Sequence, residues 1–367
     1  MNLFPSLEEK YTKESLSARE AQRLAEFIAW GPVVFQASRI MLKWGILDLI
    51  RDSKNGLTRE EICKETGKSD YAVKCLLEAS LCIGIILVDV DTNRFSLSKT
   101  GWFLLNDPAT RVNIDFNHDV NYIGWFNLEE SLLNGKPEGL KHFGSWPTVY
   151  EGLSSLPDQV QKSWFGFDHF YSDSSFSEAL KIIFDEHHVK SIYDVGGNTG
   201  KWALQCVSYN PDVTVTVLDL PQQIEMMKEN ISGKKGADRI SGYGINLLDA
   251  ASQFPQQIGL DAIWMSQFLD CFSMDEIVSI LNRAKQAMTS QTRIYIMETL
   301  WDRQKYEPAA FCLTMTSLYF TALANGNSKM YNTEDMQQCI ERAGLVIEQI
   351  HDYLGQGHSI IVCKLNK

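Results

Sequence analysis

Residues 191–221 constrain the possible fold more than any other stretch of the chain. Residues 191–195, Ser-Ile-Tyr-Asp-Val, are rich in strand formers, and Gly196-Gly197-Asn198-Thr199-Gly200 follows directly. Glycines allow the backbone to turn sharply and to approach a ligand closely, and residues 199–210 are then expected to be helical. A strand, a tight glycine turn and a helix form the first half of a nucleotide-binding unit in a doubly wound α/β domain.

The next predicted strand, residues 214–220, carries an acid at its carboxyl end. Its sequence is Thr-Val-Thr-Val-Leu-Asp-Leu, with Asp219 near the end and Pro221 just beyond. Ligands bind outside the carboxyl ends of parallel strands, so Asp219 should face the same crevice as Gly196, where a carboxylate suits the two hydroxyls of a ribose. The glycines lack the Gly-x-Gly-x-x-Gly spacing of dinucleotide sites, which disfavours a nicotinamide enzyme.

These two segments carry a resemblance that extends over nearly the whole chain. Asp194-Val-Gly-Gly-Asn-Thr-Gly200, followed by Leu218-Asp-Leu-Pro221, resembles the S-adenosylmethionine (AdoMet) site of the winged-helix O-methyltransferases of the caffeic-acid and polyketide type. The resemblance implies AdoMet as cofactor, with the glycine turn under its methionine part and the acid on its ribose. The residues that take these roles are Asp194, Gly196, Gly197 and Asp219. Asn198 replaces a third glycine, and Asn also tolerates left-handed backbone.

The resemblance assigns further residues to the cofactor site. Asn246 stands where the family has an acid that binds the adenine amine, and its amide oxygen can accept the same hydrogen bond. Ser266 replaces a family lysine near the adenine and keeps a hydroxyl. The neighbouring residues Leu220, Leu247 and Gln267 complete the expected cofactor site.

The catalytic base departs from the family. Where relatives have Leu-His-Asp-Trp, with the histidine taking the proton of the acceptor hydroxyl, this chain has Leu269-Asp270-Cys271-Phe272, so Asp270 replaces the histidine. Two glutamates orient the family histidine. Glu298 matches one of them, and the other falls near Tyr331.

Asp270 can serve as a base only if its pKa is raised. A phenol has a pKa of ~10 and an exposed Asp one of ~3.9. Burial among Trp264, Phe268 and Phe272, beside Glu298, is expected to raise the pKa of Asp270 toward neutrality. The alternative is a structural acid at the entry to the next helix.

Residues 57–97 predict a winged helix. Thr58 and Glu61 form a capping box for a first helix, Ser69 or Asp70 caps a second that reaches Ile83, and residues 85–89 and 94–97 form a hairpin. Such a module also occurs in DNA-binding regulators. In the second helix, however, Lys74 is the only base, whereas groove-reading helices cluster Arg and Lys.

Residues 18–50 are expected to be helical, with a break at Gly31-Pro32. They present a broad apolar surface, which suggests a partner. In the family this is where two subunits interlock, so the resemblance implies a homodimer. The aromatic-rich segment that follows the winged helix lines an acceptor pocket in the family, with residues 167–171 close to AdoMet.

Composition excludes several classes of protein. The net charge of -12 argues against nucleic-acid and anionic-membrane partners. The first ten residues do not resemble a signal peptide and the apolar run 81–88 is too short to span a bilayer, so we expect a cytoplasmic protein without membrane contact. The eight cysteines include no Cys-x-x-Cys pair, and neither a metal site nor a disulfide framework is indicated.

The sequence therefore predicts an α/β fold: a Rossmann-like AdoMet-dependent methyltransferase domain with a seven-stranded sheet and a reversed last strand, preceded by a helical winged-helix domain. Further strands are expected at 260–266, 293–299, 345–352 and 358–364. We expect a winged-helix dimerisation domain over 1–110, an aromatic linker over 111–165 and the AdoMet domain over 166–367. The expected reaction is methylation of a small aromatic or polyketide-like hydroxyl. The alternatives are an N-acceptor or non-methylating AdoMet chemistry on the same fold and, disfavoured by the acidic charge, a DNA-binding regulator.

Overall fold

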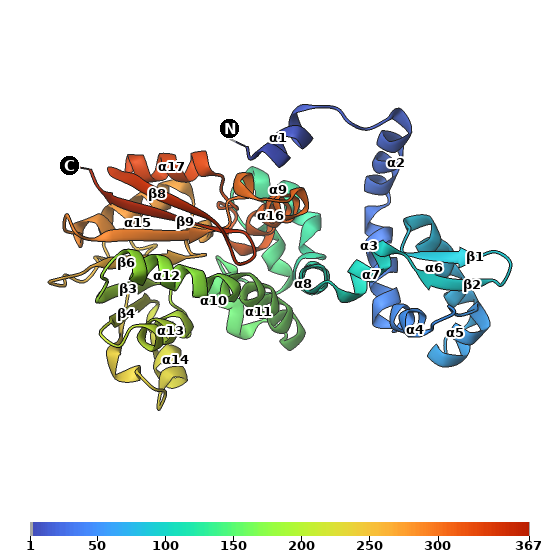
Figure 1. Cartoon of the computed structure of the whole chain (residues 1–367), viewed down its shortest axis with the longest axis horizontal. Coiled ribbons are helices and arrows are strands. Elements are labelled where there is room, and N and C mark those ends of the chain that lie inside the picture. The colour runs from blue at the N-terminus through green and yellow to red at the C-terminus, as the bar shows by residue number, and fades with distance from the viewer. Residues whose placement is uncertain (1–2, 367) are drawn as a thin grey trace. The chain divides into compact units, whose positions relative to one another are not determined.

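The computed structural model describes residues 3–366. Its contacts divide the chain into two compact units, of which one holds Glu14–Val120 and the other joins the segment ending at Lys13 to the chain from Asn121 onward. Figure 1 shows the course of the chain from the blue amino-terminal helices to the red carboxyl-terminal strands. Among the described residues no helix is long and apolar enough to cross a membrane, and no group of three or more His, Cys, Asp or Glu side chains could hold a metal ion.

The smaller unit contains the expected winged helix. Thr58 caps α5 in a capping box with Glu61, Ser69 caps α6, and β1 pairs with β2 in antiparallel register. Its elements are α2 (Ala18–Ala29), α3 (Gly31–Lys43), α4 (Ile46–Asp52), α5 (Arg59–Thr66), α6 (Asp70–Ile83), β1 (Ile86–Asp89), β2 (Arg94–Leu97), α7 (Lys99–Asn106) and α8 (Pro108–Phe116).

Residues 18–50 form three helices rather than the two that the Gly31-Pro32 break predicts. A second break falls at Gly45, whose φ of +68° lies in the left-handed region that glycine adopts most easily. The helix α2 has no buried residue and exposes the apolar side chains of Leu24, Phe27 and Ile28, the last to 70%. An exposed apolar patch of this kind marks an interaction surface.

The larger unit is built on a seven-stranded sheet in the order β5-β4-β3-β6-β7-β9-β8. Every neighbouring pair is parallel except β7 with β9 and β9 with β8, so the expected reversal at the end of the sheet is confirmed. The strands are β3 (Ser191–Val195), β4 (Thr214–Asp219), β5 (Ile240–Gly244), β6 (Ala262–Ser266), β7 (Arg293–Glu298), β8 (Leu345–Leu354) and β9 (His358–Leu365). The edge strand β5 was missed because its two glycines and polar residues give no strand signal.

Helices connect and cover these strands. The helices that precede or connect the strands are α12 (Phe176–Glu186), α13 (Lys201–Tyr209), α14 (Pro221–Ile231), α15 (Met274–Gln286), α16 (Glu307–Tyr319) and α17 (Thr333–Arg342). The α-helices earlier in this unit are α1 (Pro5–Thr12), α9 (Leu128–Asn134), α10 (Val149–Gly152) and α11 (Asp158–Ser172). The capping box expected at Ser273 and Glu276 opens α15.

Each face of the sheet has its own apolar core, because successive strand residues point to opposite faces. In β6, Ile263 and Met265 pack into one core, whereas Trp264 packs into the other. There the indole of Trp264 stacks on Trp202 of α13, with ring centroids 4.4 Å apart. Trp264 therefore lies on the sheet face opposite the core that contains Phe272.

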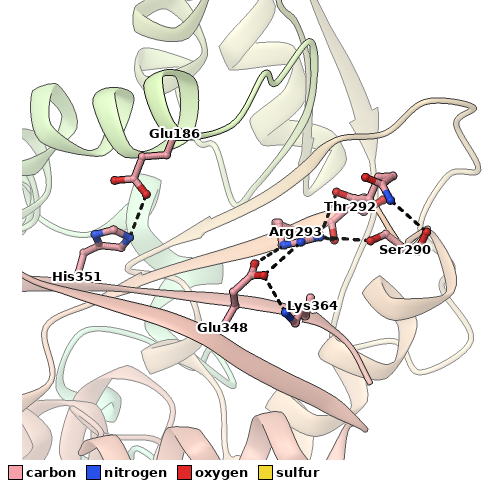
Figure 2. A network of polar contacts seen from close by, with 8 residues as sticks. Glu186, Ser290, Thr292, Arg293, Glu348, His351 and Lys364 are labelled. Atoms are coloured by element: carbon pink, nitrogen blue, oxygen red, sulfur yellow. Dashed lines mark hydrogen bonds and ion pairs between the residues drawn. The ribbon is translucent and has the colours of Figure 1, made fainter. Parts of the chain in front are cut away.

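Polar contacts join the antiparallel strands at the far edge of the sheet (Figure 2). Arg293 at the start of β7 and Lys364 on β9 both bind the carboxylate of Glu348 on β8. These two cations lower the pKa of Glu348 to about 2. His351 on β8 lies 3.7 Å from the carboxylate of Glu186 in α12. The reversed hairpin is thus tied both to the parallel strands and to a covering helix.

The contact division does not coincide with the ranges expected from the sequence. The expected linker, 111–165, is shared between the two units, since residues up to Val120 group with the winged helix. The short α1, expected in the dimerisation domain, groups with the sheet, where Phe4 donates its backbone N–H to the carbonyl oxygen of Asp302 at 3.2 Å. The three expected domain ranges remain a prediction.

Candidate cofactor and acceptor site

The carboxyl ends of five parallel strands bring the predicted site residues to one edge of the sheet. The strands β3 to β7 end at Val195, Asp219, Gly244, Ser266 and Glu298. Each predicted site residue lies at one of these ends or in the loop that follows it, apart from Asp194, one position before the end of β3. The residues scattered between positions 194 and 298 therefore share one rim, where ligands of doubly wound sheets bind.

The turn after β3 requires its small residues. Gly196, Asn198 and Gly200 have φ values of +73°, +47° and +75°, so Asn198 adopts the left-handed backbone expected of it. A Cβ on Gly197 would lie 2.5 Å from Oδ2 of Asp194, and one on Gly196 would lie 2.4 Å from the ring of Phe268. Side chains at these positions would clash with neighbouring side chains of the protein, so the turn can pack this tightly only with glycine.

Asp219 is oriented by two backbone donors. Its Oδ2 accepts the N–H of Asn198 at 2.9 Å, and its Oδ1 accepts the N–H of Leu220 at 2.7 Å. Burial raises its pKa, and the two N–H donors oppose that shift. A carboxylate oxygen can accept more than one hydrogen bond, so both oxygens keep capacity for the paired hydroxyls of a ribose. Leu220 is the residue that leads into α14.

Asp194 lies beneath the glycine turn and is almost fully buried, at 2% exposure. Burial first, and then the nearby Asp219, raise the pKa of its carboxyl to about 8. Its Oδ2 has no hydrogen-bond partner among the described residues. An orphaned buried oxygen under a turn that excludes side chains fits a site for a polar ligand such as the amino-acid part of AdoMet.

The remaining predicted cofactor residues differ in what they can offer. Asn246 is exposed, but its Oδ1 already accepts the N–H of Leu248 at 3.0 Å. The side chain of Leu247 packs in the core, so it provides an apolar floor rather than a contact with a polar group. Ser266 ends β6, and Gln267 follows in left-handed backbone at φ +44°, with an Oε1 that has no partner in the described chain.

Asp270 sits in a short 3₁₀ turn, Leu269–Cys271, and is 5% exposed. Burial raises its pKa to about 7, and the charge of Asp168 acts in the same direction. The thiol of Cys271 donates to its Oδ1 at 3.5 Å. The raised pKa expected for Asp270 is thus found, and Asp168 on α11 is a further acid that contributes to it.

Glu298, the last residue of β7, holds the turn that carries Asp270. Its Oε1 accepts the backbone N–H groups of Phe268 and Leu269 at 3.1 and 2.9 Å, and its Oε2 has no partner among the described residues. Burial raises the pKa of Glu298 well above its usual value, and Asp270 adds to the shift. The two carboxyl groups expected to act together therefore do lie together.

One expected neighbour of Asp270 was wrong. Trp264 lies on the opposite face of the sheet, because it is one residue out of phase with the side chains that point toward the turn. Phe268 and Phe272 do flank Asp270, with their rings edge to face at a centroid distance of 4.8 Å. The alternation of a strand decides this, and only the register of β6 reveals it.

Sequence reasoning missed several residues around Asp270. The indole of Trp164 donates to the hydroxyl of Tyr319 at 2.7 Å, and Asp270 is among the charges that raise the pKa of that phenol. Asn325 donates to the carbonyl oxygen of Cys271 at 2.6 Å. The Asn325-Gly326 pair reads as an ordinary turn, so no local signal marks its contact with a turn more than fifty residues away.

The arrangement brings two kinds of chemical group to one rim. The glycine turn, Asp194 and Asp219 offer a polar cradle for a nucleoside-bearing ligand. Asp270 offers a carboxyl that changes protonation near neutral pH, beside aromatic rings that suit a flat organic molecule. A proton acceptor next to a cofactor cradle is what methyl transfer to a weakly acidic nucleophile requires.

Two family models match the chain. Residues 22–95 match the Dimerisation2-like domain, and residues 125–346 match the O-methyltransferase domain. An L-tyrosine C(3)-methyltransferase of Streptomyces lavendulae is 23% identical over 326 residues, which cover 87% of this chain and 86% of that protein. The mitomycin biosynthesis 6-O-methyltransferase of the same organism is 22% identical over 336 residues, covering 90% of each.

Solved structures share the fold. An S-adenosylmethionine-dependent methyltransferase in its apo form has a TM-score of 0.69 at 20% identity, and the alignment covers 93% of this chain and 98% of the methyltransferase chain. An O-methyltransferase of neocarzinostatin biosynthesis, solved with S-adenosylmethionine and 2-hydroxy-5-methyl naphthoic acid, has a TM-score of 0.62 at 20% identity, with 90% and 96% covered. Since the O-methyltransferase match spans more than half of the 367 residues, the chain belongs to the AdoMet-dependent O-methyltransferase family and is a methyltransferase.

Proposed function

We propose that this enzyme binds AdoMet at the rim formed by β3, β4 and β6 and methylates the hydroxyl of a small aromatic or polyketide-like acceptor, with Asp270 as the base. The observation that carries the proposal is Asp270 itself, a buried carboxyl with a pKa of about 7. Such a group is ionised in part at neutral pH, and it is a far stronger base than an exposed aspartate.

The rim geometry supports the cofactor residues expected from the resemblance. Asp219 would hold the ribose hydroxyls, and the backbone of Gly196 and Gly197 would pass under the methionine part, near the orphaned oxygen of Asp194. Asn246, Leu247, Ser266, Gln267 and Leu220 would surround the remainder. When bound, AdoMet supplies the activated methyl group, so the protein must supply mainly alignment.

The base acts on the acceptor. Asp270 takes the proton of the acceptor hydroxyl as the oxygen forms its bond to the methyl carbon and the sulfur–methyl bond breaks, leaving a neutral thioether. Glu298 does not take this proton in the proposal. It keeps the Asp270 turn in place through the N–H groups of Phe268 and Leu269.

A second candidate function differs from the first in the atom that accepts the methyl group. A relative at 23% identity is named as a C(3)-methyltransferase, and another shared-fold structure is named as a dimethyltransferase of an amino-riboflavin. Sharing this fold therefore does not by itself show that the atom accepting the methyl group is an oxygen. Asp270 replaces the family histidine, and an amine with a free lone pair can accept a methyl group without a base. An amine acceptor is therefore the alternative.

A DNA-binding role finds no support in the α6 surface. Lys74 lies 3.9 Å from Glu78, and Arg59 lies 2.7 Å from Asp70. Lys74, the only base on α6, and Arg59 on the neighbouring α5 are thus both paired with acids, whereas a groove-reading helix clusters Arg and Lys. We instead propose that this unit forms a homodimer through the exposed apolar face of α2.

The test compares Asp270→Asn with the wild-type enzyme on a panel of catechols, hydroxynaphthoates and aryl amines. If Asp270 is the base, the variant binds AdoMet normally and turns over phenols roughly 10²-fold more slowly. Wild-type turnover should fall as the pH drops through about 7. Unchanged turnover with a phenol would show that Asp270 is structural, and activity on amines alone would favour the second function.

A further inference from the structure

The turn that carries Asp270 is held on two sides. Its amino-terminal side, Phe268 and Leu269, is bound through N–H groups to Glu298, as described above. Its carboxyl-terminal side, Cys271 and Phe272, is bound through two successive carbonyl oxygens to a separate segment, 325–331.

The two contacts on the carboxyl-terminal side are short and specific. Nδ2 of Asn325 donates to the carbonyl oxygen of Cys271 at 2.6 Å. The hydroxyl of Tyr331 donates to the carbonyl oxygen of Phe272 at 2.7 Å. The carbonyls at the end of a helical turn have no partner within the turn, and a single 3₁₀ turn is too short to be stable alone. These two donors therefore supply what the turn lacks.

Asn325 has no bonding capacity left for a ligand. Besides its contact with Cys271, its Nδ2 donates to the hydroxyl of Ser328 at 2.8 Å, and its Oδ1 accepts from the N–H groups of Asn327 and Ser328, each at 3.2 Å. An Asn side chain offers two donors and one acceptor oxygen, and all are engaged within the protein. Its part is to fix backbone.

Tyr331 is likewise committed to the protein. The residue is 4% exposed and packs in the same core as Leu269 and Phe272, and its hydroxyl donates to the turn, so neither its ring nor its hydroxyl is open to a ligand. The family glutamate falls near this position in the sequence. Here the hydroxyl of Tyr331 donates to the carbonyl oxygen of Phe272. An ionised glutamate could not make this hydrogen bond, because it has no proton to donate.

We propose that Tyr331 and Asn325 are positioning residues, whose hydrogen bonds to the carbonyl oxygens of Phe272 and Cys271 hold the turn so that the carboxyl of Asp270 stays buried. This rests on the proposed role of Asp270 as base. A buried carboxyl gains hydration if it can swing into water, and the turn must be held for it to stay buried. Without the two donors, the turn loosens, Asp270 becomes hydrated and its pKa falls toward the ordinary value.

The first experiment needs no acceptor. Tyr331→Phe removes one hydroxyl and keeps the ring. The matched control is Tyr295→Phe, because Tyr295 is fully buried on the other face of the sheet and its hydroxyl has no partner among the described residues. Hydrogen exchange of the peptide spanning 268–273 should become at least about tenfold faster in Tyr331→Phe, and should not change in Tyr295→Phe. Equal exchange in the two variants would overturn the proposal.

The second experiment follows Asp270 directly. The stability difference between each protein and its Asp270→Asn derivative is measured by thermal melting at pH 5 and pH 7. A raised pKa makes that difference change with pH, so the change should be clear in the wild-type pair and in the Tyr295→Phe pair, and smaller in the Tyr331→Phe pair. An undiminished change in the Tyr331→Phe pair would refute a positioning role even if the variant melts at a lower temperature.

A third measurement separates this proposal from the proposed function. With catechol as the probe acceptor, Tyr331→Phe should lower kcat and shift the pH profile to lower pH, and it should add nothing in the Asp270→Asn background. If Asp270→Asn leaves turnover unchanged, the base assignment fails while the exchange and melting results still decide whether Tyr331 holds the turn.

Discussion

Replacing Asp194 by Asn should stabilise the protein in a pH-dependent way. The carboxyl is 2% exposed, and burial together with Asp219 raises its pKa to about 8. In the unfolded chain its pKa is ~3.9. Between these values the unfolded state loses its proton while the folded state keeps it. The folded state therefore loses stability as pH rises, by ~1.4 kcal/mol per pH unit, and the loss is complete above the folded pKa.

The magnitude follows from two pH values inside that window. Between pH 5 and pH 7 the Asp194→Asn variant should gain ~2.7 kcal/mol relative to the wild type, as an upper value. The buried Asn amide also has a cost of its own, because its new N–H groups lack partners. That cost is the same at both pH values, so it cancels from the difference.

Urea unfolding followed by tryptophan fluorescence measures this difference. Trp202 and Trp264, stacked 4.4 Å apart in the core that lies on the Asp194 face of β3, should report the unfolding of this unit. Asp212→Asn, at an exposed position of the same domain, controls for the substitution itself. If the advantage of Asp194→Asn over wild type is the same at pH 5 and pH 7, the carboxyl is not held protonated and the reasoning about its burial is wrong.

Two further predictions concern the cofactor and the subunit contact. Asp219→Ala should weaken AdoMet binding by roughly 1.5 to 3 kcal/mol, because it removes the oriented acceptor for the ribose hydroxyls; calorimetry on both proteins measures this, and equal affinities would remove Asp219 from the cofactor site. Ile28→Glu places a charge on the most exposed apolar residue of α2 and should convert a dimer into monomers in light scattering at micromolar concentration, whereas a wild-type protein that is already monomeric would contradict the proposed dimer.

The cofactor rim could be predicted from the sequence because its signals are local. The strand formers, the glycine turn and the acid after the next strand lie within thirty residues of one another, and the rule that parallel strands end at one edge brings them together. The structure adds that Asn198 takes left-handed backbone and donates to Asp219. The caps at Thr58 and Ser273 were likewise readable, because a cap is set by its own side chain and the next three residues; for the second helix the sequence left Ser69 and Asp70 open, and the structure has Ser69.

The surroundings of Asp270 could be predicted only in part. The sequence identified Asp270 and Glu298 through the resemblance, but it could not show which side chains point toward them. Trp264 was placed on the wrong face, since a one-residue difference along a strand reverses the direction of a side chain. The contacts of Asn325 and Tyr331 join segments more than fifty residues apart. No local sequence pattern indicates contacts between residues so far apart in the chain.

The sequence by itself determined the fold class, because hydrophobic periodicity, turn residues and caps act within one or two elements, whereas the candidate base was indicated only by the family resemblance. Only the tertiary structure decided how deeply Asp270 is buried and which groups surround it. In the folded chain, burial raises the pKa of Asp270 to about 7, and Glu298, Asn325 and Tyr331 form hydrogen bonds to the turn that carries it. Desolvation depends on every group packed around a carboxyl, and that set is assembled by folding rather than written in any one stretch of the chain.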